Sequence, residues 1–274
     1  MSGFICPVCR EKLEAKDKSL VCRNKHTFDI AKQGYVNLLL SNQMNAKLPG
    51  DNKMMVSARR NFLNKGYYKI LSEKLCDTAV RYIKNGDTVL DAGCGEGYYT
   101  QKVYESLLEK GIQTDMLGID ISKNALAAAG KRSDRISWAV ASIFHIPAAD
   151  CSCNAVITLF APYCGEEFQR ILKQGGIMTM VIPGEKHLWS LKKAVYDKPY
   201  LNEVKDYALD GFKLIEKEKI SGEIFLPCNE DIANLFTMTP YYYKTSEEGQ
   251  RRLNSLSELT TEIEFEILTY RKDC

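Results

Sequence analysis

Short apolar runs alternate with segments of helical spacing along most of this chain. Apolar residues recur every three or four positions over 71–84, and a compact apolar run follows at 88–90. Four more near-continuous apolar runs lie at 116–120, 136–142, 154–161 and 177–183. Helical patterns at 98–110 and 123–131 separate the first of these runs. Continuous apolar runs are typical of strands buried on both faces, so the pattern predicts an α/β domain with a mostly parallel, doubly wound sheet.

Three local signals refine these boundaries. Ser122 is a good N-cap for the helix predicted over 123–131. The Pro-Gly pair before Asp51 is a turn signal, and we expect Asp51 to cap a helix over 52–65. Residues 261–271 alternate between apolar and polar, which predicts an antiparallel strand at an edge of the sheet.

The first 33 residues lack an apolar period long enough for a core of their own, so they need another source of stability. They contain the spacing C-x2-C-x12-C-x3-H, formed by Cys6, Cys9, Cys22 and His26. Two close pairs separated by a loop can converge on one tetrahedral ion, and three thiolates with one imidazole suit zinc. Because all four positions are filled by protein, the predicted zinc site is structural. It supplies folding free energy to a short segment.

The composition is that of an ordinary globular protein, with 45% hydrophobic and 26% charged residues in 274. No apolar run approaches the roughly 18 residues that span a bilayer. The N-terminus also lacks the basic and apolar regions of a signal peptide, so we expect a cytoplasmic protein without membrane contact. The net charge of +2 does not by itself indicate nucleic-acid binding, although 37 Lys and Arg can be distributed unevenly.

A glycine-rich turn follows the strand predicted at 88–90, which ends at Asp91. The glycines stand at every second position, as Gly93, Gly95 and Gly97. Glycines let a backbone turn tightly and let a ligand approach the main chain. A helix that begins near Tyr98 would present its first N–H groups to that ligand. Dinucleotide-binding loops have a different spacing, G-x-G-x-x-G.

The D-x-G-x-G-x-G spacing from Asp91 to Gly97 resembles motif I of the class I S-adenosylmethionine-dependent methyltransferases. The resemblance implies a Rossmann-like fold with a loop around the amino-acid end of S-adenosylmethionine. It also implies that Asp120, at the end of the next strand, accepts hydrogen bonds from the ribose hydroxyls, for which two carboxylate oxygens are suited. The downstream LKQGG at 172–176 strengthens the match.

Longer stretches, together with the zinc spacing, closely resemble the bacterial large-subunit (23S) ribosomal RNA guanine-N1 methyltransferases. They are FDIAKQGYVNLL (28–39), PGDNKMMVSARRNFL (49–63), GYY (66–68), LDAGCGEGYYT (90–100), FAP (160–162), PGEKHL (183–188) and MTP (238–240). The resemblance runs over nearly the whole chain. The chain then divides into a zinc-binding module (1–33), a linker and helix (34–70) and an S-adenosylmethionine-dependent methyltransferase domain (71–274).

This resemblance implies a substrate and a set of contacts. Family members methylate N1 of one guanine in a ribosomal RNA hairpin that lines the peptide exit tunnel, and one subgroup contributes to resistance to tylosin-type macrolides. The zinc module is thought to help recognise RNA, and a homodimer with a broad positively charged cleft is known in the family. The zinc ligands carry over to Cys6, Cys9, Cys22 and His26. Cofactor contacts carry over to Tyr68, Gly95, Glu96, Gly97, Tyr98, Tyr99 and His187.

This sequence departs from the general class I pattern at two places. Many relatives have an Asp after the third strand that meets the adenine amino group, whereas Ala141-Ser142 stands here. We therefore expect Ser142 or a backbone group to serve instead. FAPY at 160–163 matches only loosely the (D/N)PPY motif that other base methyltransferases use to hold an amino group. Guanine N1 is not an exocyclic amine, so this difference is compatible with the implied reaction.

The sequence offers candidates for RNA contact but no general base. His187 has a suitable ordinary pKa for taking the N1 proton, but the resemblance makes it a cofactor contact. Candidate aromatic platforms for an unstacked base are Tyr67, Tyr68, Tyr98, Tyr99, Phe160 and Tyr163, although an aromatic residue of this kind more often packs in the core. Candidate phosphate contacts, or alternatively a solvated helix face, are Lys53, Arg59, Arg60 and Lys65.

Two other functions remain open at this point. A small-molecule methyltransferase with a structural zinc knob is compatible with the near-neutral charge, but it leaves the stretches at 28–39 and 49–63 unexplained. A non-catalytic RNA-binding protein would have no need to keep the loop after Asp91 open for a ligand. Substrate specificity separates the first alternative from the RNA enzyme, and turnover of the cofactor separates the second.

Overall fold

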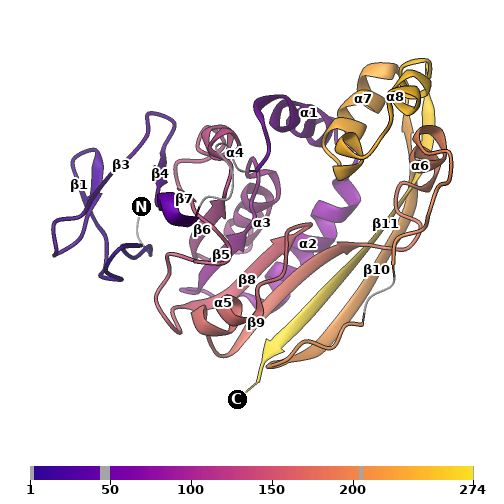
Figure 1. Cartoon of the computed structure of the whole chain (residues 1–274). Coiled ribbons are helices and arrows are strands. Elements are labelled where there is room, and N and C mark those ends of the chain that lie inside the picture. Colours follow the sequence, from indigo (N-terminus) through magenta and orange to yellow (C-terminus); the bar gives the residue numbers. More distant parts are fainter. Residues whose placement is uncertain (1–2, 44–49, 204–205, 274) are drawn as a thin grey trace.

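A mixed eight-stranded sheet forms the centre of the computed structural model, which describes residues 3–43, 50–203 and 206–273 (Figure 1). In spatial order its strands are β10 (Phe212–Leu226), β11 (Leu259–Lys272), β9 (Leu172–Pro183), β8 (Cys153–Leu159), β5 (Thr88–Ala92), β6 (Asp115–Asp120), β7 (Ser137–Val140) and β4 (Tyr35–Asn37). The six strands from β9 to β4 are parallel, and β11 pairs antiparallel with both β9 and β10. The chain runs outward from β5 in one direction and from β8 in the other. The gap between β5 and β8 is therefore the topological switch point, where α/β sheets bind ligands.

Helices cover the sheet on both faces. The helices are α1 (Lys53–Asn64), α2 (Lys69–Tyr82), α3 (Tyr98–Glu109), α4 (Lys123–Ala129), α5 (Gly165–Ile171), α6 (Trp189–Val195), α7 (Asn229–Thr237) and α8 (Glu247–Asn254), with 3-10 turns at Ser41–Gln43 and Pro240–Tyr243. Apolar side chains of α2, α3 and α4 pack into one core on one face. Side chains of α5 and of the N-terminal segment form a second core on the other. The continuous apolar runs in the sequence reflect this double coverage.

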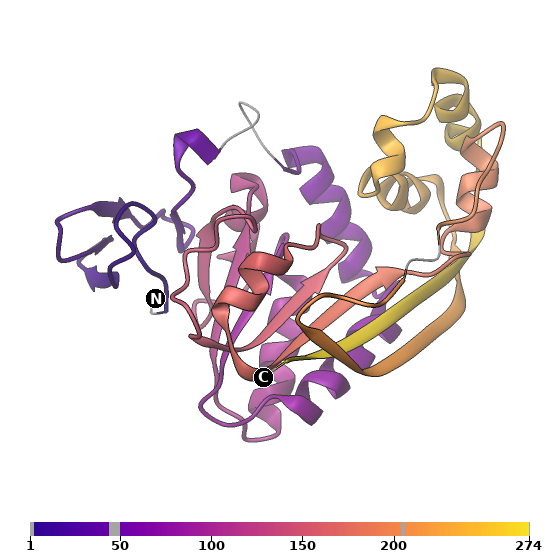
Figure 2. The same ribbon diagram turned by 60° about the horizontal axis from the view of Figure 1, so that its bottom comes forward.

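The N-terminal segment folds into a three-stranded antiparallel sheet of β1 (Glu14–Lys16), β2 (Ser19–Val21) and β3 (Thr27–Asp29). Figures 1 and 2 place this sheet and the helices α6 to α8 at opposite ends of the molecule. The small sheet is docked on the large one, because Phe4 belongs to the second core and the Ile5 N–H donates to the Pro147 carbonyl at 2.9 Å. β4 then continues into the large sheet beside β7.

The expected strands at 88–90, 116–120, 136–142, 154–161 and 177–183 all form, with shifts of a few residues at their ends. The Ser122 cap is confirmed, since its Oγ accepts from the Ala125 N–H at 3.2 Å. In the part of the chain that the structure describes, no helix combines the length and the apolar character needed to cross a bilayer.

The prediction that Asp51 caps the next helix was wrong. Asn52 is the N-cap of α1, and its Oδ1 accepts from the Met55 N–H at 3.0 Å. Asp51 pairs instead with Arg59, at 2.8 Å. Asp and Asn are about equally good caps, so a tertiary ion pair can decide which of two neighbours serves. Pro49 of the predicted turn lies outside the described residues.

The prediction of an edge strand at 261–271 was half wrong. β11 is antiparallel, as expected, but it lies inside the sheet between β9 and β10. The edge strand at this end of the sheet is β10, whose sequence FKLIEKEKISGEIFL carries Lys and Glu at close intervals. Charged side chains at an edge discourage pairing with a further strand.

Candidate functional site

The four predicted zinc ligands converge beside the small sheet. Their ligand atoms all lie within 4.8 Å of one another. The His26 Nδ1 is 3.5 Å from the Cys6 Sγ and 3.5 Å from the Cys22 Sγ, and the Cys9 and Cys22 sulfurs are 3.6 Å apart. Bond lengths of about 2.3 Å to sulfur and 2.0 Å to nitrogen give tetrahedral edges of about 3.5 to 3.8 Å. The four side chains therefore fit zinc, and they leave no position for a substrate.

The glycine loop joins β5 to α3 at the switch point of the sheet. Gly93 and Gly97 have φ values of +87° and +82°, which glycine adopts without strain. A Cβ on Gly93 would lie 2.6 Å from the Ala161 Cβ, and one on Gly97 would lie 2.8 Å from the Trp138 ring. Only glycine fits at these two positions, so the backbone itself lines the space at the end of β5.

Asp91 is buried below this loop, with 1% of its surface exposed. Its Oδ2 accepts from the Thr100 hydroxyl at 2.5 Å, whereas its Oδ1 has no hydrogen-bond partner among the described residues. Burial, aided by the nearby Asp120, raises the pKa of the Asp91 carboxyl to about 7. A buried carboxylate oxygen without a partner is suited to accept from a ligand cation, such as the ammonium group of S-adenosylmethionine.

Asp120 reaches the same loop from the end of β6. Its Oδ2 accepts from the Gly95 N–H at 3.0 Å, and its Oδ1 accepts from the Ser122 N–H at 2.8 Å. Burial raises the pKa of this carboxyl, while the two backbone donors oppose the rise. Each carboxylate oxygen keeps a further lone pair, so Asp120 can still accept from ribose hydroxyls.

Glu96 and Tyr98 are held by Arg132, a residue that the sequence analysis missed. Arg132 lies just after α4 in the sequence. Its guanidinium donates to the Glu96 Oε2 at 2.5 Å and lies 5.5 Å from the centre of the Tyr98 ring. The Glu96 Oε1 and the Tyr99 hydroxyl are buried without partners among the described residues. No linear motif marks Arg132, because it lies more than 30 positions after the loop that it supports.

Tyr68 and His187 come together although they are far apart in the sequence. The Tyr68 hydroxyl is 3.3 Å from the His187 Nε2, and the Glu264 N–H donates to the His187 Nδ1 at 3.2 Å. A backbone N–H only donates, so the His187 proton is on Nε2 and points to the Tyr68 oxygen. The Tyr68 proton is then free to donate elsewhere in the site. Phe265, also missed from sequence, packs against both rings.

Burial lowers the pKa of His187 to about 3, so this ring is a weak proton acceptor at neutral pH. We expect the chemical shift of its Cε1–H NMR signal to remain constant from pH 8 down to about pH 4. The His187→Gln variant identifies the signal, because it lacks it. In urea the same signal should titrate near the ordinary pKa of about 6.5, because burial is lost. A titration midpoint above about 5 in the folded protein would contradict the neutral, buried ring.

Ser142 follows β7 at the same edge of the sheet. It is buried, and its Oγ accepts from the Phe144 N–H at 3.2 Å. The structure thus gathers the residues expected at the cofactor on the ends of neighbouring strands, with Tyr68 and His187 arriving from outside the parallel sheet.

Two family models match separate parts of the chain. Residues 4–47 match the family model of the N-terminal zinc ribbon of RlmA, and residues 83–231 match a methyltransferase domain. The 23S rRNA (guanine(748)-N(1))-methyltransferase of Streptomyces fradiae is 38% identical over 193 residues, which cover 69% of this chain and 66% of that protein. The "Putative 23S rRNA (guanine-N(1)-)-methyltransferase YxjB" of Bacillus subtilis (strain 168) is 31% identical over 210 residues, or 72% and 71% of the two chains. The chain belongs to the family of 23S rRNA (guanine-N1)-methyltransferases.

This chain combines the zinc ribbon, with its four converging ligands, and the methyltransferase domain, so its cofactors are S-adenosylmethionine and a structural zinc ion. The match to the Streptomyces protein spans just under two thirds of that relative's length. Among solved structures, the YcgJ protein from Bacillus subtilis is similar at 14% identity, with a TM-score of 0.45 over 74% of this chain and 98% of that chain.

Two of the four basic residues expected to contact phosphate form ion pairs within the chain itself. Arg59 pairs with Asp51, and Lys65 donates to the buried Asp231 at 2.5 Å, which the Tyr67 hydroxyl also reaches at 2.7 Å. Arg59 also lies within 3.3 Å of the place where a Gly95 side chain would begin. Both residues therefore stabilise contacts within the fold. Because their charges are already paired, they are less suited to bind phosphate than free cations.

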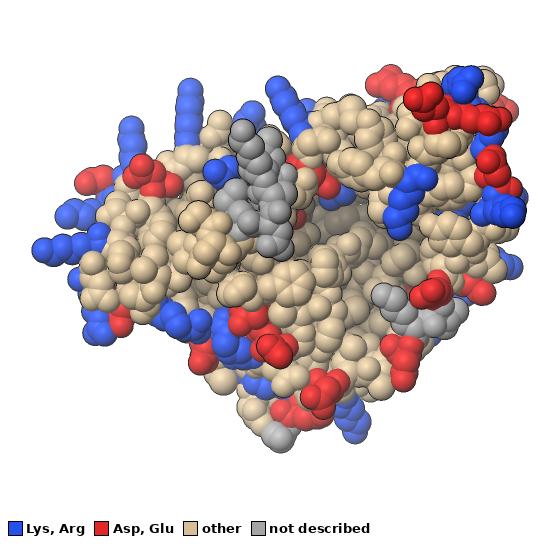
Figure 3. All heavy atoms as spheres, viewed as in Figure 1, with Lys and Arg blue, Asp and Glu red and all other residues tan. Residues whose placement is uncertain are grey.

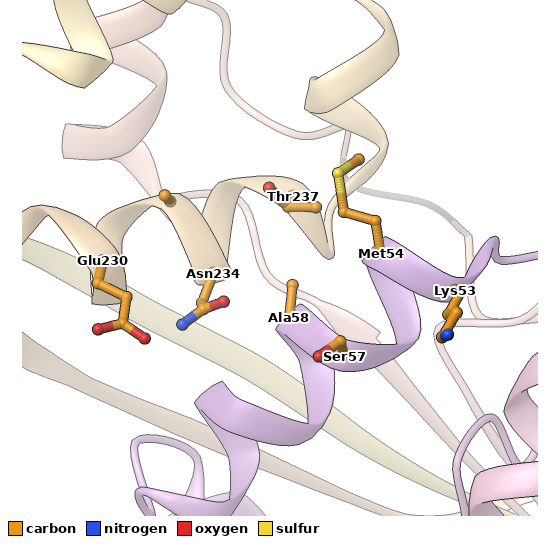
Figure 4. A pocket seen from close by; sticks show the side chains of 8 residues that line it. Lys53, Met54, Ser57, Ala58, Glu230, Asn234 and Thr237 are labelled. Carbon is orange, nitrogen blue, oxygen red and sulfur yellow. The ribbon is translucent and has the colours of Figure 1, made fainter.

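Lys53 lines a groove of about 590 Å³ between α1 and α7 (Figure 4). Arg60 is exposed on α1. The groove is lined by Lys53, Met54, Ser57, Ala58, Glu230, Ala233, Asn234 and Thr237. None of the residues expected at the cofactor lines this groove, so it is separate from the glycine loop.

Positive charge is concentrated on the zinc ribbon. Residues 3–43 hold seven Lys and Arg against four Asp and Glu, a balance of +3 in a chain whose total is +2. Figure 3 shows Lys and Arg protruding from this end, and a central hollow bordered mainly by uncharged residues. The near-neutral net charge of the whole chain therefore conceals a basic N-terminal module.

Proposed function

We propose that this chain transfers the methyl group of S-adenosylmethionine to N1 of a guanine in a hairpin of large-subunit ribosomal RNA. The similarity to guanine-N1 methyltransferases over most of the chain carries the proposal. The glycine loop, which admits no side chain at Gly93 or Gly97, lies beside buried carboxylate oxygens without hydrogen-bond partners among the described residues, and this supports the proposal. By analogy with the family, the hairpin lines the peptide exit tunnel, the enzyme acts in the cytoplasm as a homodimer, and methylation alters sensitivity to tylosin-type macrolides.

We assign the cofactor to the residues around the glycine loop. Asp91 would accept from its ammonium group, and Asp120 from its ribose hydroxyls. The loop from Gly93 to Tyr99 would line its amino-acid end, and Ser142 would lie at its adenine. Tyr68, oriented by His187, would donate its free proton to the bound molecule.

The chain's own contribution to the reaction is mainly one of positioning. When bound, S-adenosylmethionine supplies an electrophilic methyl group on its sulfonium. The protein holds guanine N1 in line with that group and excludes water, which can account for much of the rate. As N1 gains the methyl group, the bond between that methyl carbon and the sulfonium sulfur breaks, and the N1 proton passes to a base or to solvent. His187 is unsuited to accept it, because burial lowers its pKa to about 3.

The proposal is tested by transfer of labelled methyl to a protein-free large-subunit RNA hairpin. Each candidate guanine is replaced by adenine in a matched RNA, and full-length 23S RNA serves as a second substrate. We expect incorporation that disappears with one guanine, and N1-methylguanine on digestion of the product. Cofactor binding without transfer to either RNA would favour a small-molecule methyltransferase with a structural zinc module.

A further inference from the structure

Phe160 combines an exposed ring with a strained backbone. Its side chain is 48% exposed, and its φ of +54° lies in the left-handed region that residues other than glycine seldom occupy. Phe160 directly follows β8, and its N–H donates to the Val181 carbonyl of β9 at 3.1 Å. This hydrogen bond helps to hold the residue in its unfavourable conformation. Strain of this kind persists mainly at functional sites.

The Phe160 ring borders both parts of the proposed cofactor site. Its centre is 5.8 Å from the ring of Phe265, which lies 4.6 Å from His187 and 4.9 Å from Tyr68. The following residue, Ala161, is packed closely against the glycine loop. A Cβ added to Gly93 would lie only 2.6 Å from the Ala161 Cβ. A base stacked on Phe160 would therefore lie next to the loop.

The other aromatic candidates are less available. Tyr68 and Tyr98 are buried, and the Tyr67 hydroxyl is bound to Asp231. Tyr99 and Tyr163 are partly buried, and their hydroxyls are fully enclosed. A base needs an open ring face on which to stack, and among these six residues Phe160 offers one.

We propose that the exposed ring of Phe160 is the platform on which the target guanine stacks during methylation. This inference rests on the proposed function and adds the residue that receives the base. Aromatic rings stack on any base, so Phe160 contributes affinity and position, and the choice of guanine falls to polar groups elsewhere. The left-handed backbone holds the ring in place before RNA binds, which lowers the entropy lost on stacking.

The test compares Phe160→Leu, Phe160→Gly and Phe160→Trp with the unchanged enzyme on the RNA hairpin. We expect kcat/KM for RNA to fall about 10- to 100-fold for the Leu and Gly variants and to return to within about 5-fold for Trp. The Kd for S-adenosylmethionine should change less than about 2-fold, because stacking concerns the base alone. Phe160→Gly should not unfold at a lower temperature, since glycine tolerates the positive φ.

Phe225→Leu provides the matched control. Phe225 is 54% exposed on the edge strand β10, outside the site, and its loss should leave kcat/KM unchanged. Wild-type kcat/KM in Phe160→Leu would overturn the inference. So would a joint loss of cofactor affinity and folding without rescue by Trp, because the ring would then be structural. Failure of the unchanged enzyme on every RNA would overturn the proposed function and this inference with it.

Discussion

Removal of zinc will unfold the N-terminal ribbon and leave the large sheet folded. The ribbon's own strands have three residues each, and its core depends on Cys6 and Cys22 among a few apolar side chains. Apparent zinc-binding free energies in zinc-finger peptides are about 10–16 kcal/mol, far more than so small a segment gains from apolar burial. Amide exchange should become fast over residues 4–29 after chelation and remain slow in β5, β6 and β8.

The same result is expected from Cys22→Ala, with one zinc ion per chain lost by metal analysis. Cys151→Ala is the matched control, because Cys151 is exposed and lies outside the four-residue cluster. It should keep its zinc and its exchange pattern. Slow exchange over residues 4–29 in protein shown to be free of metal would contradict the structural role of the ion.

Asp91→Asn will make the fold more stable at pH 8 and weaken cofactor binding. Burial raises the pKa of the Asp91 carboxyl to about 7, from about 4 in the unfolded chain. A shift of this size means that the buried charge lowers the free energy of unfolding at pH 8 by as much as about 4 kcal/mol. The uncharged Asn avoids this loss. The variant also loses a charged acceptor for the ammonium group, so we expect the Kd for S-adenosylmethionine to rise about 10- to 100-fold.

The raised pKa of Asp91 also predicts how the free energy of unfolding changes with pH. Between about pH 4 and 7 the folded protein holds the Asp91 proton and the unfolded chain does not, so stability falls as pH rises. His187 acts in the opposite sense between about pH 3 and 6.5, because its pKa is lowered in the fold. The His187 contribution is common to both proteins, so it cancels when the variant is compared with the unchanged chain.

Urea unfolding at pH 5 and pH 8, with calorimetric titration of S-adenosylmethionine, measures both effects. Asp115→Asn is the matched control, since Asp115 is exposed at the start of β6. It should alter neither stability nor affinity. An Asp91→Asn protein that is less stable at pH 8, or that binds the cofactor as tightly as before, would show that Asp91 has no such role.

Much of the fold follows from local patterns. The parallel strands are continuous apolar runs because both faces are covered, and the zinc ligands and the glycines of the loop are close in sequence. The edge position of β10 and the inner position of β11 were not predictable, because strand order depends on pairing between distant segments. The cap of α1 was not predictable either. Asn52 serves as the N-cap, while Asp51 forms an ion pair with Arg59, which lies further along the same helix.

The sequence by itself therefore determined the class of sheet, the zinc ligand set and the glycine loop after β5, since each depends on spacing within one short segment. Only the tertiary structure decided that Arg132 holds Glu96, that His187 orients Tyr68 and that the Phe160 ring stays open to solvent. These contacts join residues from different elements, and their burial and proton positions exist only once the sheet has brought those elements together.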